Sequence, residues 1–356
     1  MILEEPPDGP GLGGGSPAEL QRLVDAADDA ALLRAVDALA ASRRYDALAD
    51  LARRCRDAVE VGRQLWGVAE HIDYRLALEG PPSHAGAVLH PGAGRFTLGP
   101  LTEVAAGAHR WADLEPHVGD LASRTALAQE RVIRGEDLRG AADVDVDLPL
   151  RLAAWEPAYA LPRYRDREAL FPAPTLPAPR AGSQRLAPGA RLPRDEAAEA
   201  LAEVAAAWAS QSEGRLAVAA VEGDAQAAVG ALAGEAATVA LEPSEALGLL
   251  QWAGASGGAR GRRRGGAAGR FAAWWAAAAL CGLPWPEDGA GEALADELGD
   301  ALGDLEWLRW QRPEVESGWV LRLAVADPLD GLAWAVEAVD AVDDDAAGRP
   351  VADEAG

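Results

Sequence analysis

The clearest chemical feature of the sequence is a run of arginine and glycine between two predicted helices, residues 256–270. We call it the Arg/Gly loop; it holds no acidic residue, and its candidate ligand-binding residues are Gly257, Gly258, Arg260, Gly261, Arg262, Arg263, Arg264 and Arg270. Guanidinium groups bind phosphate or carboxylate oxygens in pairs, and glycine lets the backbone approach a ligand closely. The loop therefore predicts an anion-binding site. The alternative is a surface loop whose arginines pair with the protein's own carboxylates.

Two carboxylates form a second candidate site. Glu222 and Asp224 follow the clearest predicted strand, residues 215–221, and lead into a helix. Side chains at the carboxyl end of a strand often line the sites of α/β proteins, so either residue could act as an acid or base. The alternative for Asp224 is an N-cap of the helix that follows.

Other patterns that carry chemistry are missing from the sequence. It has no Walker lysine motif and no Gly-x-Ser-x-Gly nucleophile elbow. Its five histidines show no metal-ligand spacing, and its two cysteines, Cys55 and Cys281, are too few for a structural zinc site. We therefore expect neither a metal nor a cofactor, and we expect both thiols to be buried and inert.

The charge of the chain restricts its partners. With 33 basic and 57 acidic residues the formal net charge is −24, which disfavours binding to nucleic acid or to an anionic membrane. The acidic, Gly/Pro-rich start lacks a signal-peptide pattern, and the longest apolar run, residues 271–281, is too short to span a bilayer. We expect a cytoplasmic protein with a protein partner or a small anionic ligand, and no membrane association.

The elements that would position these residues fall into two halves. Residues 1–15 are predicted to be disordered, and residues 16–156 to form an α-helical domain. Ser16, Pro17 and Glu19 give a clear helix start. Breaks near residues 28, 44 and 62 predict three or four antiparallel helices over the first 80 residues.

The second half predicts a different architecture. Residues 157–194 are rich in proline and arginine and predict an extended linker. In the Trp-rich domain 195–340, strands at 215–221, 238–241, 305–311 and 319–326 alternate with helices, the last helix starting at Asp327–Asp330. A small mixed β-sheet packed with helices is expected, so the fold class is α+β. Trp307 and Trp310 are expected on opposite faces of the sheet. One of them could then be exposed and contribute to binding. Residues 341–356 predict an acidic disordered tail.

Three stretches of the chain resemble an uncharacterised family of hypothetical proteins from high-GC bacteria. They are residues 99–106, 155–159 and 257–275. A family of this kind implies neither an activity nor a set of site residues.

These observations favour a non-enzymatic binding or regulatory protein that recognises an anionic ligand or acidic partner through the Arg/Gly loop. The alternative is an enzyme acting on a phosphorylated or carboxylate small molecule. Glu222 or Asp224 would then be its acid/base, with the arginines as a clamp. Nucleic-acid binding is a third class, which the net charge disfavours.

Overall fold

The computed structural model describes residues 15–142, 144, 147–179, 182–285, 291–314 and 317–341. Contacts divide the chain into two compact units, residues 1–124 with 164–169, and residues 125–163 with 170–356. The predicted disordered ends, 1–15 and 341–356, lie outside the described residues except for Gly15 and the backbone of Ala341. The prediction that residues 157–194 join two independent domains stays a prediction.

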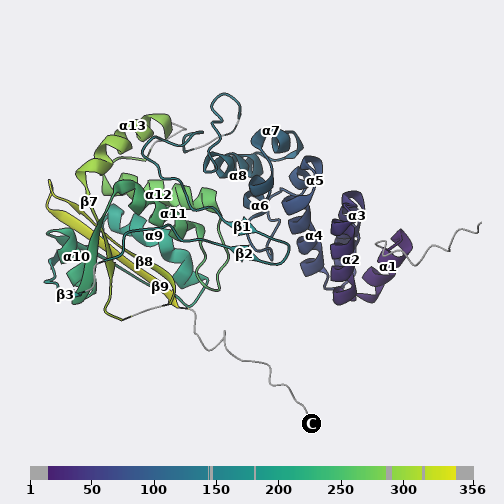
Figure 1. Cartoon of the computed structure of the whole chain (residues 1–356), viewed down its shortest axis with the longest axis horizontal. Coiled ribbons are helices and arrows are strands. Elements are labelled where there is room, and N and C mark those ends of the chain that lie inside the picture. Colours follow the sequence, from purple (N-terminus) through teal and green to yellow (C-terminus); the bar gives the residue numbers. More distant parts are fainter. Residues whose placement is uncertain are drawn as a thin grey trace, which may run out of the picture. The chain divides into compact units, whose positions relative to one another are not determined.

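The first unit is built from helices. They are α1 (Pro17–Ala26), α2 (Asp29–Ala41), α3 (Tyr45–Glu60), α4 (Trp66–Glu79), α5 (Pro82–Ala87), α6 (Leu101–Ala108), α7 (Trp111–Leu114), the 3-10 turn η1 (Glu115–His117) and the start of α8 (Leu121–Val132). Figure 1 shows α2, α3 and α4 side by side, in purple to blue. The breaks predicted near residues 28, 44 and 62 separate α1 to α4, so the first 80 residues form four helices where three or four were predicted.

Local capping explains where these helices begin. The Ser16 hydroxyl accepts a hydrogen bond from the backbone of Glu19, whose carboxylate in turn accepts from the Ser16 backbone, a reciprocal capping box. Asp28 caps α2 by accepting from Ala31 N at 2.9 Å. The central helix is α4, which packs against α2, α3, α5 and α6 and is buried on almost every side over Val68–Ala77. A helix with no exposed face belongs to a core, so α4 organises the unit.

A short hairpin, β1 (Arg163–Tyr164) with β2 (Ala169–Leu170), contributes its tip, residues 164–169, to the first unit. The Tyr164 hydroxyl donates a hydrogen bond to the buried carboxylate of Glu103 in α6. A Cβ atom on Gly99 would overlap that hydroxyl, so glycine is the residue that fits there. The Tyr74 hydroxyl of α4 donates to the carbonyl of Arg165. These two tyrosines fix the tip of the hairpin against the helices.

The second unit is built on a seven-stranded sheet. Its strands are β3 (Gln184–Arg185), β4 (Ala190–Arg191), β5 (Arg215–Glu222), β6 (Glu235–Leu241), β7 (Glu306–Gln311), β8 (Gly318–Asp327) and β9 (Leu332–Ala341). The order is β3-β6-β7-β8-β9-β5-β4, and every pairing described in it is antiparallel. The α+β class is confirmed. The mixed sheet is corrected to an antiparallel one, because β5 and β6, joined by one helix, are not neighbours but are separated by β7, β8 and β9.

Helices cover both faces of this sheet. They are α9 (Glu196–Ser210), α10 (Ala225–Leu232), α11 (Pro243–Ala255), α12 (Gly266–Leu280), α13 (Gly291–Ala301) and the 3-10 turn η2 (Leu302–Asp304). One face packs against α9, α11, α12 and α13, and the other against α10 (Figure 1). Trp307 belongs to the first of these cores and Trp310 to the second. The prediction of opposite faces is confirmed, whereas the possibility that one is exposed is wrong, because helices cover both faces.

The final helix predicted from Asp327 onward is also wrong. Asp327 accepts hydrogen bonds from Leu329 N and Asp330 N, at 2.8 and 3.2 Å, and Gly331 turns the chain at a φ of +66°. The chain then returns as β9, paired along its whole length with β8. An aspartate before a proline caps a turn as well as it caps a helix, and here the turn joins two long strands.

Among the described residues, no helix has the length and apolar character needed to cross a bilayer.

Candidate functional site

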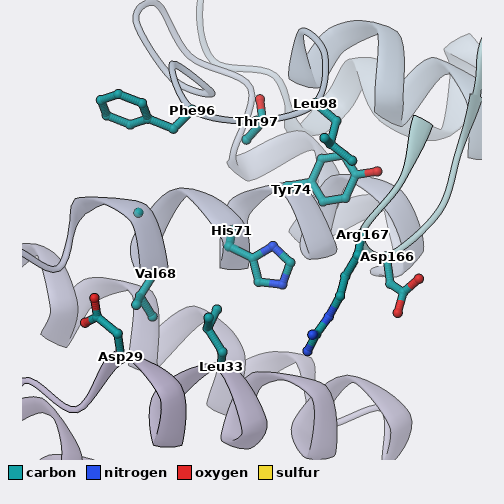
Figure 2. Close-up of a pocket in the computed structure, with 11 residues that line it drawn as sticks. Asp29, Leu33, Val68, His71, Tyr74, Phe96, Thr97, Leu98, Asp166 and Arg167 are labelled. Carbon is teal, nitrogen blue, oxygen red and sulfur yellow. The ribbon is translucent and has the colours of Figure 1, made fainter. Parts of the chain in front are cut away.

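The first unit contains a pocket of about 440 Å³ with a mainly apolar lining. Figure 2 shows its lining residues, which come from α2, from α4, from the segment 96–98 and from the hairpin tip. Leu33, Val68 and Leu98 supply aliphatic wall. The Phe96 side chain on the rim is 74% exposed. A concave, mainly apolar pocket with a few polar groups is the usual form of a small-molecule site.

His71 is the polar group at the centre of this pocket. In Figure 2 its imidazole projects from its own helix toward the helix of Leu33. The ring stacks on Tyr74, with 6.3 Å between ring centroids and 22° between planes. Burial lowers the pKa of His71, and the nearby guanidinium of Arg75 lowers it further. The imidazole is therefore neutral at neutral pH, with one nitrogen a hydrogen-bond donor and the other an acceptor.

Charged side chains stand at the edge of the pocket. Asp29, Asp166 and Arg167 line it. Arg167 is already paired with Asp37, which also accepts from Arg75 at 2.8 Å. The pocket thus has two carboxylates and one compensated guanidinium, and its floor is neutral. This arrangement suits a neutral, partly apolar ligand better than a strong anion.

Hydrogen bonds hold the segment above the pocket in place. The Thr97 hydroxyl donates a shared hydrogen bond to two backbone carbonyl oxygens, that of Gly94 at 2.9 Å and that of Gly99 at 2.8 Å. The backbone N–H of Phe96 donates to the carboxylate of Glu70, which lies on α4. Backbone fixed in this way presents Phe96 and Leu98 at the rim without tying down their side chains.

The Arg/Gly loop lies in the second unit, between α11 and α12, and it folds closely upon itself. Arg264 N donates to Ala255 O at 2.8 Å, and a Cβ on Gly257 or Gly261 would overlap the facing backbone of the same loop. Gly258 has a φ of +87° and lies against the carboxylate of Asp340, so that a Cβ there would overlap it. These three glycines are required by the packing of the loop, whether or not it binds a ligand.

The arginines of the loop do not form one cluster. Arg260 is exposed and paired with Glu213, and its backbone N–H donates to the Ser212 hydroxyl at 3.1 Å. Arg263 stacks over the ring of Phe171, with its guanidinium carbon 4.5 Å from the ring centroid. Arg262 and Arg264 have exposed side chains. The pairing of arginines with the protein's own carboxylates, the alternative given above, describes Arg260 and also Arg270.

Arg270 has a structural environment of its own in α12. Its side chain and that of Glu156 are both 0% exposed, and their two hydrogen bonds are each 2.7 Å long. The remaining donors reach Gln129 Oε1 at 2.6 Å and the carbonyls of Pro149 and Arg151 at 3.0 Å. Protein oxygens thus occupy the guanidinium completely. Burial alone would raise the pKa of Glu156, but the hydrogen bonds and charge of Arg270 outweigh it and hold the pKa below its ordinary value.

Comparison with known protein families matches most of the chain to one family. The family of unknown function DUF6183 matches residues 30–328. The chain belongs to this family. No curated protein and no solved structure matches it.

In this member of DUF6183, the stretches 155–159 and 257–275 meet through Arg270 and Glu156. Tyr159 and Trp274 complete the contact by donating to Glu156 Oε1 at 2.7 and 2.9 Å. The stretch 99–106 contains Gly99 and Glu103, which hold the Tyr164 hydroxyl. The segments that carry the family resemblance therefore form buried hydrogen-bond networks, one in each unit.

The two carboxylates predicted near β5 are at the end of that strand. Asp224 caps α10 by accepting from Ala227 N at 2.8 Å, which confirms the N-cap interpretation. Glu222 is exposed at the last position of β5. Within the described parts of the chain, no group of three or more His, Cys, Asp and Glu side chains is placed to hold a metal ion.

Sequence reasoning did not identify the pocket around His71. Its lining residues come from positions between 29 and 167, and only the fold brings them together. One signal was available. Gly67, His71 and Tyr74 are spaced by four and three residues, so they share one face of a helix.

Proposed function

We propose that the protein is a binding protein whose first unit takes a small, neutral, partly aromatic molecule in the pocket around His71. The observation that carries this proposal is a neutral imidazole on the floor of a mainly apolar pocket. The described part of the structure contains no hydrogen bond of the imidazole to protein, so its nitrogens are available to a ligand.

The size and lining of the pocket support this ligand class. About 440 Å³ accommodates a molecule of one or two rings, with Leu33, Val68 and Leu98 as apolar contacts. Phe96 is a large exposed aromatic side chain at the rim, and covering it with a ligand would remove apolar surface from water. A hydroxyl or N–H on the ligand would pair with His71.

A binding role agrees with the class favoured by the sequence, although the site is a different one. The anion site at the Arg/Gly loop stays a prediction.

A cytoplasmic location is also part of the proposal, and it is supported by the two cysteines, both of which are free thiols.

The test is a titration of the full chain with phenol and indole, followed through the ring protons of its histidines. There are five histidines, so their signals can be assigned with single variants. We expect both probes to shift the His71 signals and to raise the melting temperature of the protein. We expect His71→Ala to abolish the rise in melting temperature. The matched control is His84→Ala, since His84 pairs with Asp46 and does not line the pocket.

Two results would contradict the proposal. One is a His71 signal that neither probe shifts at millimolar concentration. The other is a His71 pKa at or above the ordinary value of about 6.5, because a protonated imidazole would call for an anionic ligand.

A further inference from the structure

The sheet of the second unit opens at one end, between two of its central strands. The ladder of β7 and β8 ends at the pair Arg309 and Leu323. β7 continues to Gln311 beside β6, and β8 begins at Gly318 beside β9. Each strand thus keeps its outer neighbour while the two separate from one another.

A cavity of about 440 Å³ lies at this opening, and it has two kinds of wall. Pro174, Leu176, Leu249, Trp252 and Val320 form an apolar part. The charged part consists of Arg309, Arg312, Arg322 and Glu314. A lining that is apolar on one side and charged on the other is suited to an amphiphilic small molecule.

Two of these arginines share a single carboxylate. Arg312 donates to both oxygens of Glu337, at 2.8 and 2.7 Å, and Arg322 donates to Glu337 Oε1 at 2.8 Å. The side chains of Arg322 and Glu337 are buried, so solvent screens their charges weakly. Both oxygens of Glu337 thus accept from these two guanidiniums, and this carboxylate is not available to compensate a third one.

Arg309 adds a third positive charge. Its Nη1 donates to the carbonyl of Pro177 at 2.9 Å, and within the described residues it has no carboxylate partner. Burial lowers the pKa of Arg309, and no neighbouring acid offsets that effect. Among the described residues that line the cavity, Arg309 thus supplies a guanidinium whose charge no carboxylate partner compensates, in a chain whose net charge is −24.

Trp252 on the apolar wall has an unused hydrogen-bond donor. Its Nε1 atom is buried, and the described structure contains no acceptor for it. The ring stacks on Trp319, with centroids 4.8 Å apart and 18° between planes, and so has a fixed orientation. Buried donors in proteins are normally paired, and an acceptor atom on a ligand that reaches Nε1 would satisfy this one.

We propose that this cavity binds a small organic anion, with a phosphate or carboxylate group on Arg309 and an apolar body against Trp252. This site is independent of the pocket around His71. It is also distinct from the Arg/Gly loop, whose arginines do not line it. The anionic ligand expected from the sequence would then bind to an arginine of the sheet.

The test uses the full chain labelled with 15N at its tryptophans, titrated with phenyl phosphate, benzoate and the neutral benzyl alcohol. The chain has 12 tryptophans, and Trp252→Phe identifies the Trp252 indole signal. We expect at least one of the two anions to shift that signal and to bind at least tenfold more tightly than benzyl alcohol. The anion that binds more tightly indicates whether the natural head group is a phosphate or a carboxylate.

Arg309→Gln is the main variant, because Arg309 has no carboxylate partner among the described residues whose charge would be left buried. We expect it to weaken anion binding at least tenfold, with the other indole signals unchanged. Arg262→Gln in the Arg/Gly loop is the matched control and is expected to have no effect. If Arg309→Gln disturbs the other indole signals, Arg309→Lys takes its place, and weaker but measurable binding is expected.

The proposal is overturned if neither anion shifts the Trp252 signal at millimolar concentration. It is also overturned if Arg262→Gln weakens binding as much as the Arg309 variant, a result that would place the anion on the Arg/Gly loop.

Discussion

Replacement of Arg270 by alanine tests whether the Arg/Gly loop ends in a structural residue or a ligand-binding one. Arg270 and Glu156 are both fully buried and joined by two hydrogen bonds. Without the arginine, the carboxylate of Glu156 would stay buried with three remaining donors: Tyr159 Oη, Trp274 Nε1 and Ala153 N. We therefore expect a large loss of stability and no specific loss of anion binding.

The magnitude follows from the burial of the pair. Removing one partner of a buried ion pair costs about 3–5 kcal/mol, because the other charge is left uncompensated. Three donors still bind Glu156 in the variant, so we expect the loss of stability to lie near the lower end of this range, at about 3 kcal/mol. Since domains are stable by only about 5–15 kcal/mol in total, a loss of this size is easily measured.

The assay is urea denaturation followed by tryptophan fluorescence. Ten of the 12 tryptophans lie in the second unit, so the signal reports mainly on the part of the chain that contains Arg270. Arg260→Ala is the matched control, because the side chains of Arg260 and Glu213 are 57% and 76% exposed. Exposed pairs contribute about 0–1 kcal/mol. A loss for Arg270→Ala no larger than for this control would refute the reasoning.

The same pair gives a pH dependence with a definite sign. The pKa of Glu156 is held below its ordinary value in the folded protein. Its contribution to stability is therefore complete above the unfolded pKa, about 4.5, and is lost as the pH falls through the lower folded pKa. In Arg270→Ala, burial alone would raise the pKa of Glu156. We expect the difference in stability between the two proteins to shrink as the pH falls from 7 toward 4.

Two further predictions concern a glycine and the thiols. Gly99→Ala would overlap the Tyr164 hydroxyl and is expected to cost about 1–3 kcal/mol, measured by hydrogen exchange in α6. Gly107→Ala has open space around its Cβ and is expected to be neutral or slightly stabilising; equal losses for both would contradict this account. Burial raises the pKa of Cys55 to about 11 and that of Cys281 to about 12. We expect both thiols to react with a disulfide reagent at pH 8 at least tenfold more slowly in the native chain than in denaturant, and rapid native labelling would disprove it.

Local sequence signals predicted most of the elements correctly. The cap at Ser16, the break at Asp28 and the cap at Asp224 all depend on residues within one helical turn, so they can be read without the fold. The wrong prediction of a helix at Asp327 has the same origin. Its carboxylate caps a turn, and nothing local distinguishes that turn from the start of a helix.

The candidate sites could be predicted only in part. The anion site expected at the Arg/Gly loop stays a prediction, and the arginines that line a cavity in the second unit are Arg309, Arg312 and Arg322. Arg309 lies in β7, Arg312 directly after it and Arg322 in β8, and they line one cavity because β7 and β8 separate beside them. Composition could not indicate this, since a run of arginine says nothing about where its partners lie.

The sequence alone determined the start of most helices, the positions of β5 to β8 and the α+β class, because these depend on contacts a few residues apart. The tertiary structure decided the partners of Arg260 and Arg270, the first and last arginines of the Arg/Gly loop. Arg260 pairs with a carboxylate 47 residues away, and Arg270 with one 114 residues away. Only the folded chain fixes which charges meet over such separations, and how far water is excluded from them. The segment that looked most like a binding site therefore proved to be tightly packed, anchored at its end by the buried Arg270.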